Sequence, residues 1–299
     1  GRCTVPDMSG TPSPDVTGFF DPATHTITYL VADLATGAAI IIDPVLDYDA
    51  ASGRTSTASV DKVLAAVEER GQRLERVLET HAHADHLSGA AVIRERTGAR
   101  VGVGRSITQV QSTFAPLFEA DDVVPDGSAF DDLLDDGETF PLGALTVEVI
   151  HTPGHTPACV SYRIGDAVFV GDTLFMPDYG TARCDFPGGD AATLYRSVQR
   201  ILALPEATRI FVGHDYLPSG GGRTDFAWET TVAAEKADNI HVGAGRSEAE
   251  FVAMRQARDA TLKAPQLILP ALQVNIRAGH MPPPDASGAV FLRLPVDRL

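Results

Sequence analysis

The segment ETHAHADHLSGA, residues 79–90, concentrates metal-competent side chains at the point where an apolar stretch ends. His81, His83, Asp85 and His86 lie within six consecutive positions. Neutral imidazole and carboxylate groups both offer a lone pair to a metal ion at neutral pH. The whole chain has nine histidines, so three in one hexapeptide exceed the background. This run predicts a metal site directly after a buried strand.

Three other stretches end in the same residue types. TVEVIHTPGH, AVFVGD and RIFVGHD each pass from apolar residues into His or Asp, and they contain His155, Asp172 and His214. Strand ends that gather at one edge of a sheet, or of two packed sheets, would bring these groups together. The sequence has no G-x-S-x-G elbow, Walker loop or H-E-x-x-H motif. The pattern therefore favours metal-dependent chemistry.

Composition limits the partners and the compartment. The 299 residues have a formal net charge of −16, which gives no electrostatic reason to bind nucleic acid or an anionic membrane surface. No apolar run reaches the ~18 residues of a membrane span. The three cysteines fit a reducing compartment, and the first residues show no signal-peptide core. We expect a cytoplasmic protein that binds neither nucleic acid nor membranes.

Predicted strands and helices alternate, which is typical of a layered α/β fold. We expect a flexible N-terminal arm over residues 1–16, then a single domain over 17–299 with a C-terminal extension from about 245. A strand is predicted over 25–33 and a polar loop over 45–59. Ser59 and Asp190 are predicted helix N-caps. The segment 265–285 is expected to be a proline-punctuated tail packed on the body.

The four metal-competent stretches resemble the metallo-β-lactamase superfamily in the H-x-H-x-D-H run, TPGHT, VGDTLF and VGHDY. That resemblance implies an αββα sandwich with the metal site at one edge, between the two sheets. HTPGHTPACVSY, GTARCDFPGGDAATLYRSV and LPALQVNIRAG are similar to the persulfide dioxygenases of the ethylmalonic encephalopathy protein family, particularly its bacterial branch. The resemblance covers residues 17–283, nearly the whole chain.

The family resemblance implies one Fe(II) per chain, held by His81, His155 and Asp172. Two imidazoles and one carboxylate on one face of the iron would leave positions for a substrate sulfur and O2. The implied reaction converts glutathione persulfide and O2 to glutathione and sulfite, in sulfide detoxification. Relatives of this kind also imply a homodimer.

Four further metal-competent residues accompany the implied iron ligands: His83, Asp85, His86 and His214. A two-metal hydrolase of this fold would use these groups, so the alternative is a glyoxalase-II-like thioester hydrolase with two Zn(II). We expect them instead to orient the ligands of a single iron.

The resemblance also implies contacts to the substrate. Arg183 aligns with a basic residue that holds glutathione in glyoxalase II enzymes, and Tyr216 aligns with a tyrosine that contacts it. Arginine suits this role because it grips a carboxylate with two hydrogen bonds. Tyr179, in the loop between Asp172 and Arg183, is a weaker candidate.

The remaining cysteines and histidines have less motif context. Cys159 is expected in the core. Cys184 offers a third possibility, a non-catalytic sulfur carrier or sensor that exchanges sulfur with a persulfide. His151 is expected to support the ligands. Three histidines without a motif are expected at the surface: His25, His241 and His280.

Overall fold

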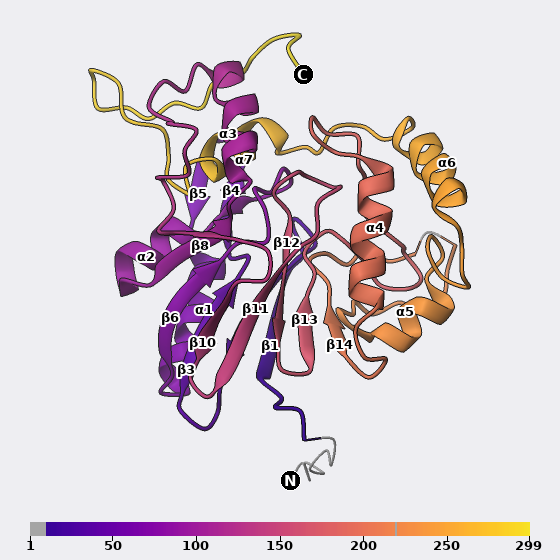
Figure 1. Ribbon diagram of the computed structural model, residues 1–299. Helices are drawn as coiled ribbons and strands as arrows, with labels where there is room; N and C mark the ends of the chain where they lie inside the picture. The colour runs from indigo at the N-terminus through magenta and orange to yellow at the C-terminus, as the bar shows by residue number, and fades with distance from the viewer. Residues whose placement is uncertain (1–9, 219) are drawn as a thin grey trace.

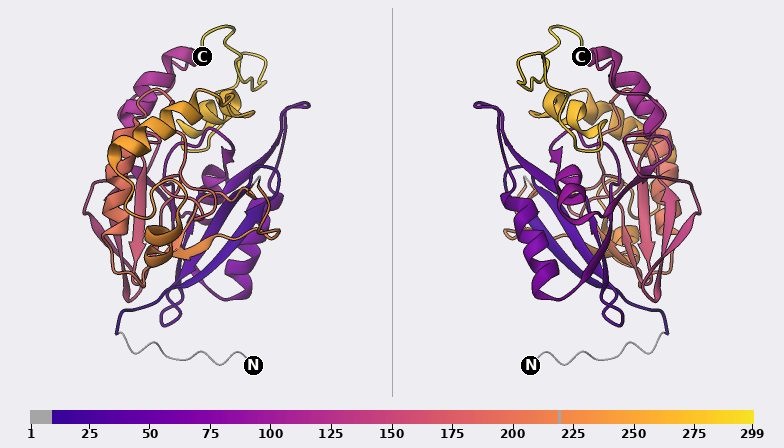
Figure 2. Two further views of the ribbon diagram at one scale, coloured as in Figure 1. Left: turned by 90° about the vertical axis from the view of Figure 1, so that its right-hand side faces the viewer. Right: turned by 90° about the vertical axis from the view of Figure 1, so that its left-hand side faces the viewer.

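The computed structural model describes residues 10–218 and 220–299, and two stacked β-sheets form its centre (Figure 1). The first sheet has the strand order β1 (Asp15–Asp21), β2 (Thr26–Ala32), β3 (Ala38–Ile42), β6 (Arg73–Leu78), β8 (Arg100–Gly104), β9 (Asp132–Leu134). The second has the order β10 (Thr139–Leu142), β11 (Leu145–His151), β12 (Val160–Ile164), β13 (Ala167–Phe169), β14 (Arg209–Phe211), β15 (Glu229–Thr231). Figure 2 shows the indigo-to-purple and magenta-to-pink strands as separate layers.

Helices cover the outer face of each sheet (Figure 1). The first sheet packs against α1 (Ala58–Glu69), α2 (Ala90–Thr97) and α3 (Ile107–Phe114). The second packs against α4 (Ala191–Leu202), α5 (Val232–Asp238) and α6 (Glu248–Asp259). Because successive strand residues face opposite sides, Ile27 and Tyr29 of β2 pack between the sheets, whereas Leu30 packs toward the helices. The predicted αββα sandwich is confirmed.

Strand direction explains why the polar strand ends meet. β3, β6 and β8 are mutually parallel. In the other sheet, β11 and β13 are both antiparallel to β12, and β14 is parallel to β13. The carboxyl ends of β11, β13 and β14 therefore share one edge of their sheet. The segments that follow these strands and β6 meet at this edge of the sandwich.

The segment 45–59 differs from the predicted loop. It forms β4 (Val45–Asp49) and β5 (Arg54–Ser56), which join β7 (Leu87–Ser88) in a small third sheet. The Asp47 carboxylate accepts hydrogen bonds from the backbone N–H (2.8 Å) and hydroxyl (2.7 Å) of Ser59. Ser59 therefore ties α1 to β4, and the N-cap position belongs to Thr57. The predicted cap of α4 is confirmed, because Asp190 accepts from the Thr193 N–H.

The structure refines the predicted bounds of the N-terminal and C-terminal segments. Residues 1–9 of the predicted arm lie outside the described residues, and β1 begins at Asp15, two residues before the predicted domain boundary. The predicted tail contains α7 (Ile268–Asn275), whose Ile268 and Leu272 pack into the core beside the first sheet. Within the described residues, no helix is both long and apolar enough to cross a membrane.

Candidate metal centre

His81, His155 and Asp172 form the three-residue group, in which one ligand atom from each lies within 4.8 Å of the others. Asp172 Oδ2 lies 3.6 Å from His81 Nε2 and 3.5 Å from His155 Nε2. Ligand atoms bound ~2 Å from one metal ion lie roughly 3 Å apart, so a small contraction would suit a shared ion. All three side chains are buried, and they follow β6, β11 and β13.

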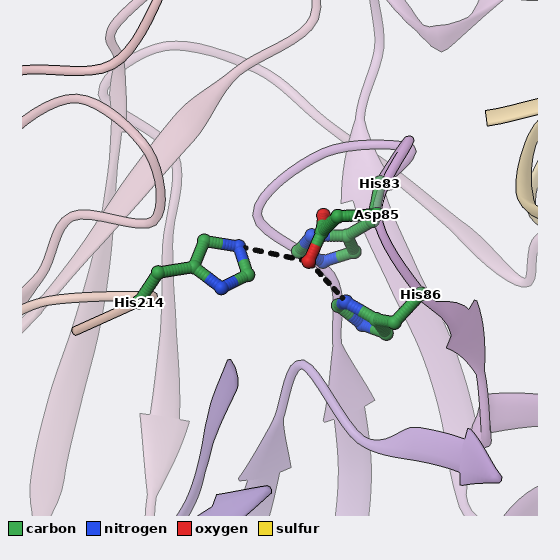
Figure 3. A group of neighbouring side chains, drawn as sticks. All are labelled: His83, Asp85, His86 and His214. Atoms are coloured by element: carbon green, nitrogen blue, oxygen red, sulfur yellow. Dashed lines mark hydrogen bonds and ion pairs between the residues drawn. The ribbon is translucent and has the colours of Figure 1, made fainter. Parts of the chain in front are cut away.

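A second cluster, the four-residue group, consists of His83, Asp85, His86 and His214 (Figure 3). Asp85 Oδ2 lies 3.3 Å from His214 Nε2 and 3.2 Å from His86 Nδ1, as the dashed lines show. His214 Nε2 also lies 3.3 Å from Asp172 Oδ1. The two carboxylate oxygens of Asp172 therefore face different groups, which is the arrangement of a carboxylate that can bridge two sites.

Hydrogen bonds orient the imidazoles. Each of four rings places Nδ1 against a polar neighbour: His81 against Thr80 Oγ1 (2.9 Å), His86 against Thr26 Oγ1 (3.1 Å), His155 against the Arg183 carbonyl (2.7 Å) and His214 against the His25 carbonyl (3.3 Å). A carbonyl can only accept, so Nδ1 of His155 and His214 is the protonated nitrogen. Such contacts fix the ring and leave the lone pair on Nε2.

The atoms that face one another in these groups lack partners of their own. Within the described residues, Nε2 of His81, His86 and His214 and Oδ1 of Asp172 are buried without a hydrogen bond. Buried polar atoms without a partner are costly, and a cation would satisfy all of these. Burial alone would raise the pKa of Asp172, but the adjacent imidazoles hold it well below its ordinary value. The donor set therefore fits a metal ion, since ligands must be deprotonated.

His83 is placed differently. Its Nε2 lies 3.1 Å from Asp43 Oδ1 and 3.4 Å from Glu79 Oε2, and both carboxylates are buried. Burial would lower the pKa of His83, but the two carboxylates raise it well above its ordinary value. Asp43 and Glu79 are not among the predicted site residues. Asp43 ends the stretch AAIIID, so the passage from apolar residues to Asp was a usable signal.

An open pocket leads to the three-residue group, and His155 and Asp172 line it. Of the predicted substrate contacts, Arg183, Tyr216 and Tyr179 also line this pocket. The Tyr216 and Tyr179 rings lie against each other, with centroids 5.1 Å apart.

The guanidinium of Arg183 already has protein partners. Its Nε and Nη2 each lie 2.7 Å from a carboxylate oxygen of Asp185, and its Nη1 donates to the Lys263 carbonyl at 2.7 Å. Arg183 therefore stands at the predicted place, but its donors are engaged within the protein.

Asn275 holds the histidine-rich loop in place. Its side-chain amide donates to the carbonyls of His83 and His86, both at 2.8 Å, and its oxygen accepts from the Ser88 N–H at 2.8 Å. These bonds satisfy the backbone of a buried loop. Asn275 lies within LPALQVNIRAG, but its type and spacing alone did not indicate this role.

Cys159 and Cys184 are both buried. Cys159 lies in the core as expected, and burial raises its pKa to about 12. Burial also raises the pKa of the Cys184 thiol, and the Cys184 N–H donates to Asp259 at 2.9 Å. Reactive cysteines are exposed and have a lowered pKa. The environment of Cys184 therefore disfavours a role in sulfur exchange.

Two of the three histidines expected at the surface are not there. His241 is buried, and its Nδ1 accepts from the Thr181 N–H at 2.9 Å. His25 is half-buried, and its ring lies beside Tyr216. His280 is exposed as expected. His151 lies outside both groups, and its Nε2 pairs with the Pro157 carbonyl at 3.0 Å.

Comparison with known proteins agrees with this geometry. Residues 22–214 match the family model of the metallo-beta-lactamase superfamily. A probable metallo-hydrolase of Burkholderia pseudomallei is 52% identical, over 95% of this chain and 99% of that protein. Glyoxylase B2 of Dictyostelium discoideum is 48% identical, over 90% and 92%.

The resemblance to persulfide dioxygenases is also confirmed. The mitochondrial persulfide dioxygenase ETHE1 of Bos taurus is 33% identical, over 89% of each chain. The crystal structure of ETHE1 from Myxococcus xanthus is similar with a TM-score of 0.71 and 34% identity, over 89% of this chain and all of that one. The matched family model and the similar structure, together with the αββα sandwich, show that the chain belongs to the metallo-beta-lactamase superfamily.

Proposed function

We propose that this protein is a persulfide dioxygenase that oxidises glutathione persulfide with O2 to sulfite and glutathione, using one Fe(II). The observation on which the proposal rests is the three-residue group: two imidazoles and one carboxylate, with His155 and Asp172 facing an open pocket. This is the ligand set of non-haem Fe(II) oxygenases. Similarity to persulfide dioxygenases over most of the chain supports the proposal.

A bound Fe(II) with these three ligands would supply open coordination positions where a thiolate sulfur and O2 meet. Hydrogen bonds within the protein orient the two histidine ligands. The Arg183 carbonyl keeps the His155 proton on Nδ1, and Thr80 holds the ring of His81. Phe175 and Phe186 add apolar surface to the pocket lining.

The alternative is a glyoxalase-II-like thioester hydrolase with two Zn(II), favoured by a specific observation. The four-residue group is complete, and Asp172 faces both groups. Two zinc ions would supply Lewis-acid activation of a thioester and of water. Relatives named as a metallo-hydrolase and a glyoxylase are also more similar in sequence than the persulfide dioxygenases are.

The two proposals differ in O2 uptake, measured on Fe(II)-loaded protein after addition of glutathione persulfide. Sulfite and metal content are determined on the same sample. We expect O2 consumption to equal sulfite formation at one iron per chain. His280→Gln, at an exposed histidine outside both groups, is the matched control and keeps full activity. Two zincs per chain, no O2 uptake and hydrolysis of a glutathione thioester would establish the alternative.

A further inference from the structure

Helix α6 forms part of the pocket wall and is pinned to the loop that follows Asp172. Arg255 is 1% exposed, and its Nη1 donates to the Thr181 carbonyl at 3.0 Å. Its Nε donates to Asp259 at 2.8 Å, and Asp259 accepts from the Cys184 N–H at 2.9 Å. Two bonds from one helix therefore hold the loop at residues 181 and 184, on either side of the carbonyl that orients His155.

Three arginines line the pocket, and they differ in what holds their charge: Arg183, Arg255 and Arg258. The guanidinium of Arg183 is paired with Asp185, and that of Arg255 with Asp259. Within residues 10–218 and 220–299, the Arg258 side chain has neither an ion pair nor a hydrogen bond, and the residue is exposed. Arg258 follows Arg255 by three positions, so both lie on the pocket side of the helix.

Negatively and positively charged side chains occupy different parts of the pocket. The carboxylates of Asp172 and Asp85 lie at the metal-competent end of the pocket, whereas Arg258 lines it as a solvent-exposed residue. A metal ion held at the first end would prefer a soft thiolate sulfur to a carboxylate, whereas the guanidinium of Arg258 at the second end attracts a carboxylate. A thiol compound with carboxylates would therefore enter sulfur first and leave a carboxylate at the mouth.

We propose that Arg258 is the specificity-determining cation that receives a carboxylate of the substrate. The inference rests on the proposed function to the extent that the substrate is a glutathione derivative, which holds for both the dioxygenase and the thioester hydrolase. A guanidinium can bind a carboxylate through two parallel hydrogen bonds. Arg258 can do so without giving up a partner, whereas Arg183 would first have to release Asp185.

The test is the dissociation constant of reduced glutathione, measured by calorimetry on the metal-loaded protein. Glutathione is a product of both proposed reactions, so the readout does not depend on turnover. We expect Arg258→Gln to weaken binding about tenfold, the usual size of one charge-assisted interaction at an exposed site. Glutathione diethyl ester, whose carboxylates are neutralised, should bind the wild type and R258Q equally. Arg258→Lys should retain part of the affinity.

Two further variants make the result decisive. Arg196→Gln, an exposed arginine of α4 paired with Glu248 and outside the pocket lining, should leave binding unchanged. Arg183→Gln should weaken binding less than R258Q does. A larger loss in R183Q, or unchanged affinity in R258Q, overturns the inference while the proposed function stands. If the wild-type protein did not bind glutathione at all, both the role of Arg258 and the proposed function would be overturned.

Discussion

The two metal-competent groups share Asp172 as a neighbour, but they differ in how they meet solvent. The three-residue group reaches the open pocket through His155 and Asp172. In the four-residue group, only Asp85 lines that pocket, and the three histidines are 0–1% exposed. A substrate can therefore approach the first group directly, whereas the second lies behind it.

The groups also differ in how their charge is balanced without a metal. Burial lowers the pKa of His81 well below its ordinary value, so this ring is neutral and ready to bind a metal. Burial would lower the pKa of His214 too, but Asp172 and Asp85 raise it to about 9. His214 must therefore lose a proton before its Nε2 can bind a metal ion, whereas His81 need not. A complete set of ligand types therefore does not make two sites equivalent.

Asp172→Ala should have the largest effect, because it removes the carboxylate that faces both groups. We expect loss of bound metal and a fall in turnover of more than about 100-fold, beyond the loss seen for residues that only support a ligand. Metal content and O2 uptake are measured together. The isosteric Asp172→Asn variant controls for packing. A D172A protein with full iron content would contradict the assignment of Asp172 as a ligand.

A matched pair of histidine variants separates the groups. His155→Ala should lose the iron and nearly all activity, whereas His214→Ala should keep one iron per chain and lose about tenfold in turnover. The reason is that His155 would bind the iron beside Asp172 Oδ2, whereas His214 faces the other carboxylate oxygen, Oδ1. Metal content per chain is the direct measurement. A fall from two metals to one in H214A would show that the four-residue group holds its own ion.

The features that the sequence predicts correctly depend on residues that are close together in the chain. Apolar stretches that end in His or Asp indicated both strands and ligands, because a strand end at a sheet edge is where polar groups can converge. His81, His155 and Asp172 follow three such strands, and the structure brings them together. Asp190 was recognisable as a cap because its partner is three residues away.

The parts that sequence reasoning missed depend on distant partners. Asn275 bonds to the His83 carbonyl across 192 positions, and Arg255 to the Thr181 carbonyl across 74. No local periodicity reports such contacts. The local pattern predicts Ser59 as a cap, but its partner Asp47 lies twelve positions away and belongs to another element. Arg183 and Arg258 look alike as residues, and only the structure shows which one is already paired.

Threonines that support the histidines provide a finer test of the comparison. Thr80 donates to Asp43 Oδ2 at 2.7 Å and lies 2.9 Å from His81 Nδ1, whereas Thr26 lies 3.1 Å from His86 Nδ1. Thr80→Val should lower turnover or iron affinity about tenfold, since loss of such a support weakens a ligand. Thr26→Val should change both by less than about threefold. Equal losses would mean that the two groups contribute alike to the reaction.

The smallest effect on turnover is expected for a buried carboxylate outside both groups, Glu235 of α5. Burial raises its pKa to about 8 from an ordinary value of 4.5, and within the described residues Oε1 has no hydrogen-bond partner. Between these two pH values the unfolded chain releases a proton that the folded protein keeps. The free energy of unfolding should therefore fall as pH rises from 4.5 to 8, by up to about 1.4 kcal/mol per pH unit.

Glu235→Gln removes this titration, so its stability should depend less on pH over the same range, and it should exceed the wild type near pH 8. Urea denaturation at pH 5.5 and 7.5 measures the difference, with turnover unchanged at both. Parallel pH dependence of the two proteins would show that Glu235 ionises normally. The slope that remains in E235Q comes from the other buried groups with shifted pKa values, among them His214, His241 and Glu79. With the contribution of Glu235 removed, the pH dependence of the free energy of unfolding can be compared between metal-free and metal-loaded protein.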